Sequence, residues 1–278
     1  MGRLGRALAI FGLVAGLVGL PVREATSAPN AAIVVDAKSG KVLYSDKPDA
    51  RRHPASLTKM MTLYMLFEQV DSRRVNLKTD ITVSRYCARQ EPSKLGLKPG
   101  QTITVHAAIL ALVTKSANDV ACAVGEHLSG SESAFAREMT NRARRLGMRK
   151  TVFRNASGLP DRAQVTTARD MAILGRALQN DFPRDFKYFS VQSFKWNGNT
   201  YSNHNRLLGR VKGVNGIKTG YTRASGFNLV SSAKRGRREI IAVVLGGDSG
   251  KARDARMTEL IEKYLPKART RRSIWRRR

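Results

Sequence analysis

The stretch "HPASLTKMMTLYMLFEQV", residues 53–70, combines a helical pattern of apolar residues with a serine and a lysine near its start. Apolar positions such as Leu63 and Phe67 recur three and four apart, as in a helix with a buried face. On a helix, residues i and i+3 have β-carbons roughly 5–6 Å apart, so the hydroxyl of Ser56 and the amine of Lys59 can meet. The stretch therefore predicts a packed helix that begins with a hydroxyl–amine pair.

Two interpretations fit this pair. Ser56 lies where the free N–H groups and the positive dipole end of a helix stabilise negative charge, which suits a nucleophile. In the other interpretation, Ser56 is only the helix N-cap and Lys59 is a solvated side chain one turn later. About one Ser-x-x-Lys pair is expected by chance in a chain of this length. A second pair, Ser231 and Lys234, lies in a strand pattern that points the two side chains to opposite faces.

Strand patterns lie at both ends of the chain, with helix patterns between them. Two strands surround a turn at Ser39-Gly40, and three more are predicted near the C-terminus, at residues 213–221, 227–234 and 238–247. Helices are predicted at residues 56–70, 104–128 (two helices), 132–148, 168–180 and 252–265. This order predicts an α+β domain: one mainly antiparallel sheet flanked by helices, closed by the terminal segments, with an inserted helical lobe.

Two further motifs favour the nucleophile interpretation. "KSAND" places Ser116 and Asn118 at the junction between two predicted helices, and "GIKTGY" places Lys218-Thr219-Gly220 on a predicted strand. Lys-Thr-Gly arises by chance in well under about one chain in ten. A glycine at position 220 lets a substrate backbone approach the strand closely. The three motifs follow one another on the element types that their chemistry requires, so chance is a poor explanation.

Together these motifs resemble those of the penicillin-binding and serine β-lactamase superfamily. The chain is most similar to the D-alanyl-D-alanine carboxypeptidases of serine peptidase family S11, and the likeness runs from about Ala31 to Leu265. It extends to "PASLTKMMT", "SKLGLKPG", "LVTKSANDVA", "NASGLP", "TTARDMA" and "GIKTGYTRASGFNLVSSAKR". The resemblance implies a β-lactamase/transpeptidase-like fold, peptidoglycan stem peptides as substrates and β-lactam antibiotics as inhibitors. It implies no metal or organic cofactor.

The resemblance also implies the catalytic roles. Ser56 would attack the carbonyl of the penultimate D-alanine and form an acyl-enzyme. Lys59 would take the serine proton, so it must be neutral when it acts, and a nearby Lys218 would disfavour its charged form. Ser116 would relay protons toward the leaving group.

The implied substrate-binding residues are Asn118, Lys218, Thr219, Gly220, Tyr221 and Arg253. Asn118 would hold the substrate amide, while Lys218 and Thr219 would bind the terminal carboxylate with help from Arg253. The backbone N–H groups of Ser56 and Tyr221 would form the oxyanion hole.

Three alternatives stay open at this point. A class A β-lactamase needs a deacylating glutamate, and none of Glu126, Glu132 and Glu138 begins the Glu-x-x-Leu-Asn loop of that class. A DD-endopeptidase that cuts peptidoglycan cross-links has the same catalytic parts, so the motifs do not distinguish it from a carboxypeptidase. A non-enzymatic, basic cell-wall-binding protein would suit the charge of the chain, although intact motifs argue against it.

The N-terminal segment reads as an export signal. Arg3 and Arg6 precede an uncharged apolar run from Ala7 to Leu20, which is short for a membrane span. Small residues at 25–27 offer a cleavage site, and an uncleaved anchor is the alternative. We therefore expect a signal peptide at 1–27, a catalytic domain at 28–266 that works in the periplasm or cell envelope, and a basic Arg-rich tail at 267–278. We expect no second domain after Leu265, because only thirteen residues follow it.

The chain is strongly basic, with a formal net charge of +29 from 50 basic and 21 acidic residues among 278. For an exported protein this charge favours anionic wall polymers or lipid head groups as partners rather than nucleic acid. The tail "PKARTRRSIWRRR" shows no apolar helical face, so we expect at most weak contact with an anionic membrane or wall polymer.

Cys87 and Cys122 are the two cysteines of the chain. Export permits a disulfide, but two isolated cysteines make no framework, and Cys122 lies in an apolar helical pattern where a small core residue suffices. The sequence therefore favours unpaired cysteines over a bridge. The histidines are scattered, and no Cys/His cluster has metal-ligand spacing.

Overall fold

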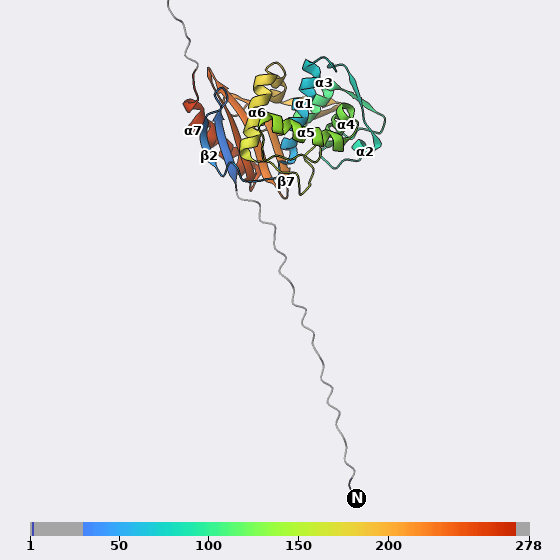
Figure 1. Cartoon of the computed structure of the whole chain (residues 1–278), viewed down its shortest axis with the longest axis horizontal. Coiled ribbons are helices and arrows are strands. Elements are labelled where there is room, and N and C mark those ends of the chain that lie inside the picture. The colour runs from blue at the N-terminus through green and yellow to red at the C-terminus, as the bar shows by residue number, and fades with distance from the viewer. Residues whose placement is uncertain (1, 3–29, 271–278) are drawn as a thin grey trace, which may run out of the picture.

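A computed structural model of the chain describes residue 2 and residues 30–270 (Figure 1). Apart from residue 2, the predicted signal peptide lies outside the described residues, and so do residues 271–278 of the predicted basic tail. Among the helices of the described part, none combines the length and the apolar character that crossing a membrane requires.

A five-stranded antiparallel sheet forms the frame of the molecule, as the strand patterns predict. Its strands lie in the order β2-β1-β9-β8-β7. The N-terminal strand pairs with a C-terminal strand, Ala31 opposite Leu245, so the two ends of the chain close the sheet. The bounds are β1 (Ala31–Asp36), β2 (Val42–Asp46), β7 (Val214–Thr222), β8 (Gly226–Arg235) and β9 (Arg238–Gly247).

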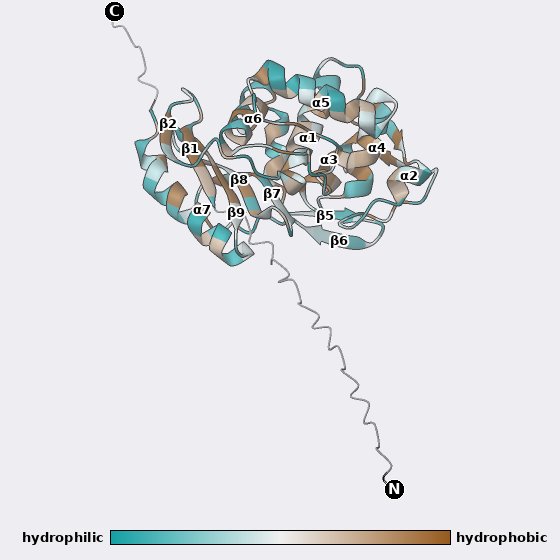
Figure 2. Cartoon of the chain, turned by 60° about the horizontal axis from the view of Figure 1, so that its bottom comes forward, coloured by the Kyte–Doolittle hydropathy of each residue, from teal (hydrophilic) through white to brown (hydrophobic). Residues whose placement is uncertain are grey.

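Helices cover both faces of the sheet, so its central strands are buried on both sides. Alternate residues of β1 face opposite layers, because side chains alternate along a strand. Ile33 and Val35 join the core beneath α6 (Ala168–Asp181), whereas Ala32 and Val34 pack with α7 (Gly250–Tyr264). In Figure 2 the apolar strands β1, β8 and β9 lie between these two helices. The predicted cap of α6 is confirmed, since Thr167 Oγ1 accepts a hydrogen bond from the Asp170 N–H.

The helical lobe is inserted between β2 and β7, as predicted. Its helices are α1 (Lys59–Asp71), α2 (Arg85–Ala88), α3 (Val105–Val113), α4 (Asn118–Ser129) and α5 (Glu132–Leu146). Helix α1 is buried without interruption from Lys59 to Phe67, so it is a central helix rather than one with a single buried face. The prediction that the helix begins at Ser56 needs a correction, because a 3₁₀ turn, η1 (Ala55–Thr58), precedes α1.

Several short elements carry too few residues for a periodic pattern, and the sequence did not indicate them. They are the antiparallel strand pair β3 (Asp80–Thr82) and β4 (Thr102–Thr104), the hairpin of β5 (Ser193–Trp196) and β6 (Asn199–Ser202), and the 3₁₀ turns η2 (Asp185–Ser190) and η3 (Leu265–Lys267).

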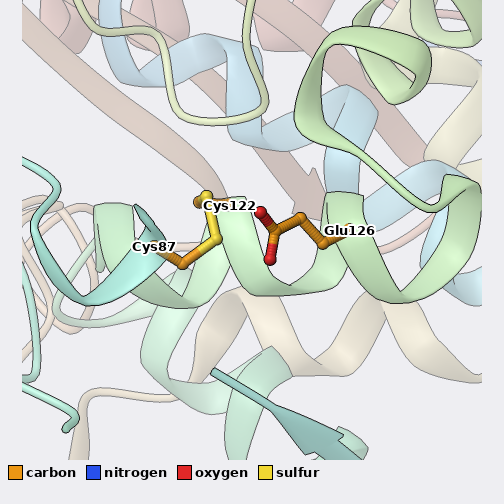
Figure 3. A group of neighbouring side chains, drawn as sticks. All are labelled: Cys87, Cys122 and Glu126. Carbon is orange, nitrogen blue, oxygen red and sulfur yellow. A yellow bond between two sulfur atoms is a disulfide. The ribbon is translucent and has the colours of Figure 1, made fainter. Parts of the chain in front are cut away.

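The expectation of unpaired cysteines is wrong: Cys87 and Cys122 form a disulfide that joins α2 to α4 (Figure 3). The reason is the unpredicted helix α2, which Ser84 caps by accepting a hydrogen bond from the Cys87 N–H and which brings Cys87 beside α4. The carboxylate of Glu126 lies within 4.8 Å of both sulfur atoms. A disulfide sulfur is no thiolate, however, and the thiolate is the form that binds metal.

We expect the double substitution Cys87→Ala and Cys122→Ala to lower the free energy of unfolding by about 3 kcal/mol, since it opens a loop with a sequence separation of 35 residues. Urea unfolding of the variant and the oxidised wild type measures the difference. Reduced wild type is the control for the lost side-chain volume. A loss below about 1 kcal/mol would show that the lobe does not depend on this cross-link.

Candidate active site

Ser56 lies at the contact between the η1 turn and strand β7. A β-carbon built on Gly220 would stand 3.1 Å from the Ser56 nitrogen, so this strand position has no room for a larger residue. Gly158 approaches the same turn from the loop that precedes α6. Its φ is +89°, and a β-carbon there would stand 2.9 Å from the Ser56 nitrogen and overlap the Ala55 carbonyl group. Two glycines thus clamp the turn that carries the serine.

The interpretation of Ser56 as a helix N-cap is wrong. Pro54 occupies the N-cap position of η1 and Thr58 that of α1, and neither makes a side-chain capping bond. The Ser56 hydroxyl instead lies 3.2 Å from the Lys59 amine. Lys59 is also not solvated, because its exposed fraction is 0%.

The Lys59 amine has three partners in its buried site. Its Nζ lies 2.6 Å from Asn118 Oδ1, 2.6 Å from the Ser157 carbonyl oxygen and 3.2 Å from Ser56 Oγ. The first two partners can only accept hydrogen bonds, whereas a hydroxyl can also donate. A neutral amine has two hydrogens for these two acceptors, which would leave its lone pair for the proton of the Ser56 hydroxyl.

Electrostatics favour this neutral form. Burial lowers the pKa of Lys59 well below its usual value, and the positive charge of Lys218 lowers it further, as the sequence predicts. The carboxylates of Asp119 and Glu132 act against this shift and raise the pKa of Lys59. Burial is the largest of these effects, since it penalises the charged form of the amine.

The Ser-x-Asn motif forms the opposite wall. Asn118 opens α4, and its side-chain Nδ2 donates to the Glu91 carbonyl at 2.8 Å while its Oδ1 accepts from Lys59. Ser116 precedes the helix with a φ of +60° and is 3% exposed. Its buried Oγ has no hydrogen-bond partner among the described residues. The motif thus places an unpartnered hydroxyl in the wall of the cavity that Ser56 also lines.

Asp119 is a structural residue of the site that the sequence reasoning missed. Its buried carboxylate accepts hydrogen bonds from the N–H groups of Leu95, Gly96 and Leu97 at 2.9–3.2 Å. In the same loop, the Ser93 carbonyl accepts a hydrogen bond from the Asn118 N–H at 2.7 Å. An acidic residue directly after the Ser-x-Asn motif was the available signal.

A cavity of about 760 Å³ opens above these residues. Seven of the nine predicted site residues line it: Ser56, Ser116, Asn118, Thr219, Gly220, Tyr221 and Arg253. Lys59 and Lys218 are buried below them, with exposed fractions of 0% and 2%. The structure therefore brings the three sequence motifs together, although Ser56 and Gly220 lie 164 positions apart in the sequence.

Lys218 and Arg253 are neighbouring cations. Burial and the charge of Arg253 lower the pKa of Lys218 to about 7. The Arg253 guanidinium pairs with Asp254 at 2.7 Å and donates to the Asn228 carbonyl at 3.2 Å. The structure places Arg253 in the wall of the cavity.

Further cations line the cavity that no sequence motif indicated: Arg206, Arg223 and Lys251. His204 lies among the lining residues as well. Partial desolvation, followed by the positive charges of Lys218 and Lys115, lowers the pKa of His204 to about 4, so it is neutral at pH 7. The cavity therefore favours anionic ligands.

A smaller cavity of about 170 Å³ adjoins the first one and shares Gly158, Leu159, Pro160 and Thr222 with it. Pro54, Ala55 and Ala224 add apolar surface to its wall. It lies at the end of β7 that follows Gly220, on the side away from Lys218.

Comparison with known sequences gives the same family as the motifs. Residues 21–249 match peptidase family S11, D-alanyl-D-alanine carboxypeptidase. The chain is 32% identical over 255 residues to D-alanyl-D-alanine carboxypeptidase DacF of Bacillus subtilis (strain 168), which covers 88% of the chain and 64% of the relative. It is 36% identical over 236 residues to DacA of Escherichia coli (strain K12), covering 82% and 59%. The chain thus spans less than two thirds of either relative.

Solved structures agree in fold. The chain is similar to D-alanyl-D-alanine carboxypeptidase DacD from Francisella tularensis, with a TM-score of 0.83 and 28% identity over 92% of this chain and 74% of that one. It is also similar to penicillin-binding protein D2 from Listeria monocytogenes in its ampicillin-bound form, with a TM-score of 0.73 and 29% identity over 87% and 98% of the two chains. The predicted α+β fold of the penicillin-binding proteins is confirmed, and the chain belongs to peptidase family S11, the D-alanyl-D-alanine carboxypeptidases.

Proposed function

We propose that the protein is a serine-type D-Ala-D-Ala carboxypeptidase that removes the terminal D-alanine of peptidoglycan stem pentapeptides through an acyl-enzyme. The observation that carries this proposal is the buried Lys59 amine, which faces the Ser56 hydroxyl at 3.2 Å on the floor of a cation-lined cavity. Family membership supports it.

In the proposed acylation step, Ser56 Oγ attacks the carbonyl carbon of the penultimate D-alanine while its proton passes to the Lys59 amine. The backbone N–H groups of Ser56 and Tyr221 stabilise the oxyanion. The C–N bond then breaks, and the leaving D-alanine amine takes a proton through Ser116. Water attacks the ester in the second half-reaction and releases the shortened peptide and free Ser56.

In the proposed complex, the substrate lies along strand β7, with its terminal carboxylate near Lys218 and its acyl part near Thr222. Lys218, Thr219 and Arg253 hold the terminal carboxylate, and Asn118 contributes to holding the substrate amide. Gly220 allows the peptide backbone to lie against the strand next to Ser56. The acyl part of the substrate then continues toward Thr222 and the smaller apolar cavity.

A β-lactam presents a carboxylate and a reactive amide in the same arrangement, so we propose that it acylates Ser56 and inhibits the enzyme. The ampicillin-bound form of the Listeria protein is a precedent in a similar structure. We further propose export through residues 1–27 to the periplasm or cell envelope, a catalytic domain at 28–266, and weak contact of the basic tail at 267–278 with anionic membrane or wall polymers.

The test of the proposed function is release of D-alanine from a synthetic stem pentapeptide. We expect one D-alanine per peptide, and we expect prior treatment with benzylpenicillin to abolish the release. A cross-linked muropeptide dimer is assayed in parallel, because a DD-endopeptidase would cleave the dimer faster than it trims the pentapeptide. Cleavage of neither substrate, together with salt-sensitive binding to cell walls, would contradict the proposal and favour a wall-binding protein.

A further inference from the structure

Glu132 is a buried carboxylate that the proposed chemistry does not use. It is the first residue of α5 and is 6% exposed. Its Oε1 accepts a hydrogen bond from the Ala156 N–H at 3.0 Å, and its Oε2 accepts one from the Tyr86 hydroxyl at 3.0 Å. Glutamate side chains are rarely buried this deeply unless hydrogen bonds or opposite charges compensate for the loss of water.

The loop at residues 156–158, which binds Glu132, also binds Lys59. The Ser157 carbonyl accepts from Lys59 at 2.6 Å, and the Ala156 carbonyl accepts from Thr62 Oγ1 at 2.6 Å, one turn further along α1. The next residue, Gly158, lies against the turn that carries Ser56. The Glu132 carboxylate thus binds the 156–158 loop through the Ala156 N–H, and the same loop binds the Lys59 amine through the Ser157 carbonyl.

Glu132 also acts on Lys59 through its charge. The charged groups that act on Lys59 come from three elements: Lys218 on β7, Asp119 on α4 and Glu132 on α5. Lys218 and burial favour the neutral amine, and the two carboxylates favour the protonated one. Asp119 is bound by three loop N–H groups, whereas Glu132 receives a single N–H and the Tyr86 hydroxyl.

We propose that Glu132 is a positioning residue: it holds the 156–158 loop against Lys59, and its negative charge shifts the pH range in which Ser56 is acylated. The inference rests on the proposed function, in which Lys59 is the base. A base whose pKa is too low accepts the serine proton poorly. The negative charge of Glu132 raises the pKa of Lys59 and so offsets part of the decrease that burial causes. A purely structural residue at a helix N-terminus would support folding without moving the pH range.

The test is the rate of acylation by a fluorescent penicillin between about pH 4 and pH 9, with thermal unfolding as the check of folding. Glu132→Gln keeps the size of the side chain and an acceptor oxygen for the Ala156 N–H, and its amide nitrogen can donate to the Tyr86 oxygen, but the charge is removed. Loss of that charge lowers the pKa of Lys59, so Lys59 becomes neutral at lower pH. We expect the acidic limb of the rate profile to move down by about half a pH unit or more.

Three matched variants separate charge from structure. Tyr86→Phe removes one hydrogen bond and keeps the charge, and Glu138→Gln removes an exposed charge from the same helix. Glu132→Asp keeps the charge on a shorter side chain. We expect the acidic limb to stay in place in all three, with a lower maximal rate in Glu132→Asp.

The outcomes distinguish this inference from the proposed function. Wild type that is not acylated at any pH overturns both. Acylated wild type with an unmoved limb in Glu132→Gln overturns the inference alone, and so does an equal shift in Glu138→Gln. If Glu132→Gln does not fold, Glu132→Asp becomes the test, because it keeps the charge. A shift of its acidic limb by about half a pH unit would then overturn the inference.

Discussion

Replacing Ser56 by alanine is expected to abolish covalent labelling by benzylpenicillin. Intact mass spectrometry of the wild type should show a single penicilloyl adduct, and Ser56→Ala should show none. The physical reason is that Ser56 Oγ faces the buried Lys59 amine at 3.2 Å, so it is the hydroxyl placed to lose its proton to a neutral base. Removing a nucleophile of this kind costs at least about 10³-fold in rate.

Ser72→Ala is the matched control for this variant. Ser72 follows the other end of α1, is exposed, and donates a hydrogen bond to the Glu68 carbonyl at 2.7 Å. We expect its adduct to form at the rate of the wild type. Disappearance of penicillin from the solution is followed in the same samples, because rapid deacylation would also leave no adduct. An adduct on Ser56→Ala would contradict the assignment of the nucleophile.

Replacing Gly158 by alanine is expected to destabilise the fold by about 5 kcal/mol or more and to prevent acylation. The new β-carbon would overlap the Ala55 carbonyl oxygen and carbon and stand 2.9 Å from the Ser56 nitrogen. These are backbone atoms of the turn that carries Ser56, so they cannot move aside as a flexible side chain would. The φ of +89° adds a cost of its own for a residue with a β-carbon.

Gly147→Ala separates the two costs. Gly147 has the same φ of +89°, but a β-carbon there would meet nothing within 4 Å. We therefore expect this control to lose about 1 kcal/mol and to keep full acylation. Chemical denaturation gives both losses, and the fluorescent-penicillin rate gives activity. Equal losses in the two variants would show that the close approach of Gly158 to the Ser56 turn does not matter.

Much of the fold is predictable because it rests on local pattern. The strand patterns in residues 31–46 and 213–247, separated by turn residues, indicate the strands of the sheet, and Thr167 marks the start of α6. The short helix α2 is not predictable in this way, since four residues give no period. The disulfide was missed for the same reason, because only α2 brings Cys87 beside Cys122.

The sequence by itself determined the order of the three motifs and, through its resemblance to the S11 peptidases, the family; that resemblance also implied which residues meet in the cavity. The tertiary structure alone decided the chemical state of those residues. The pKa of Lys59 lies well below its usual value because the fold removes the amine from water and because the charge of Lys218 acts on it, against the charges of Asp119 and Glu132. Burial and long-range charge depend on packing between distant segments, and no spacing along the chain encodes them.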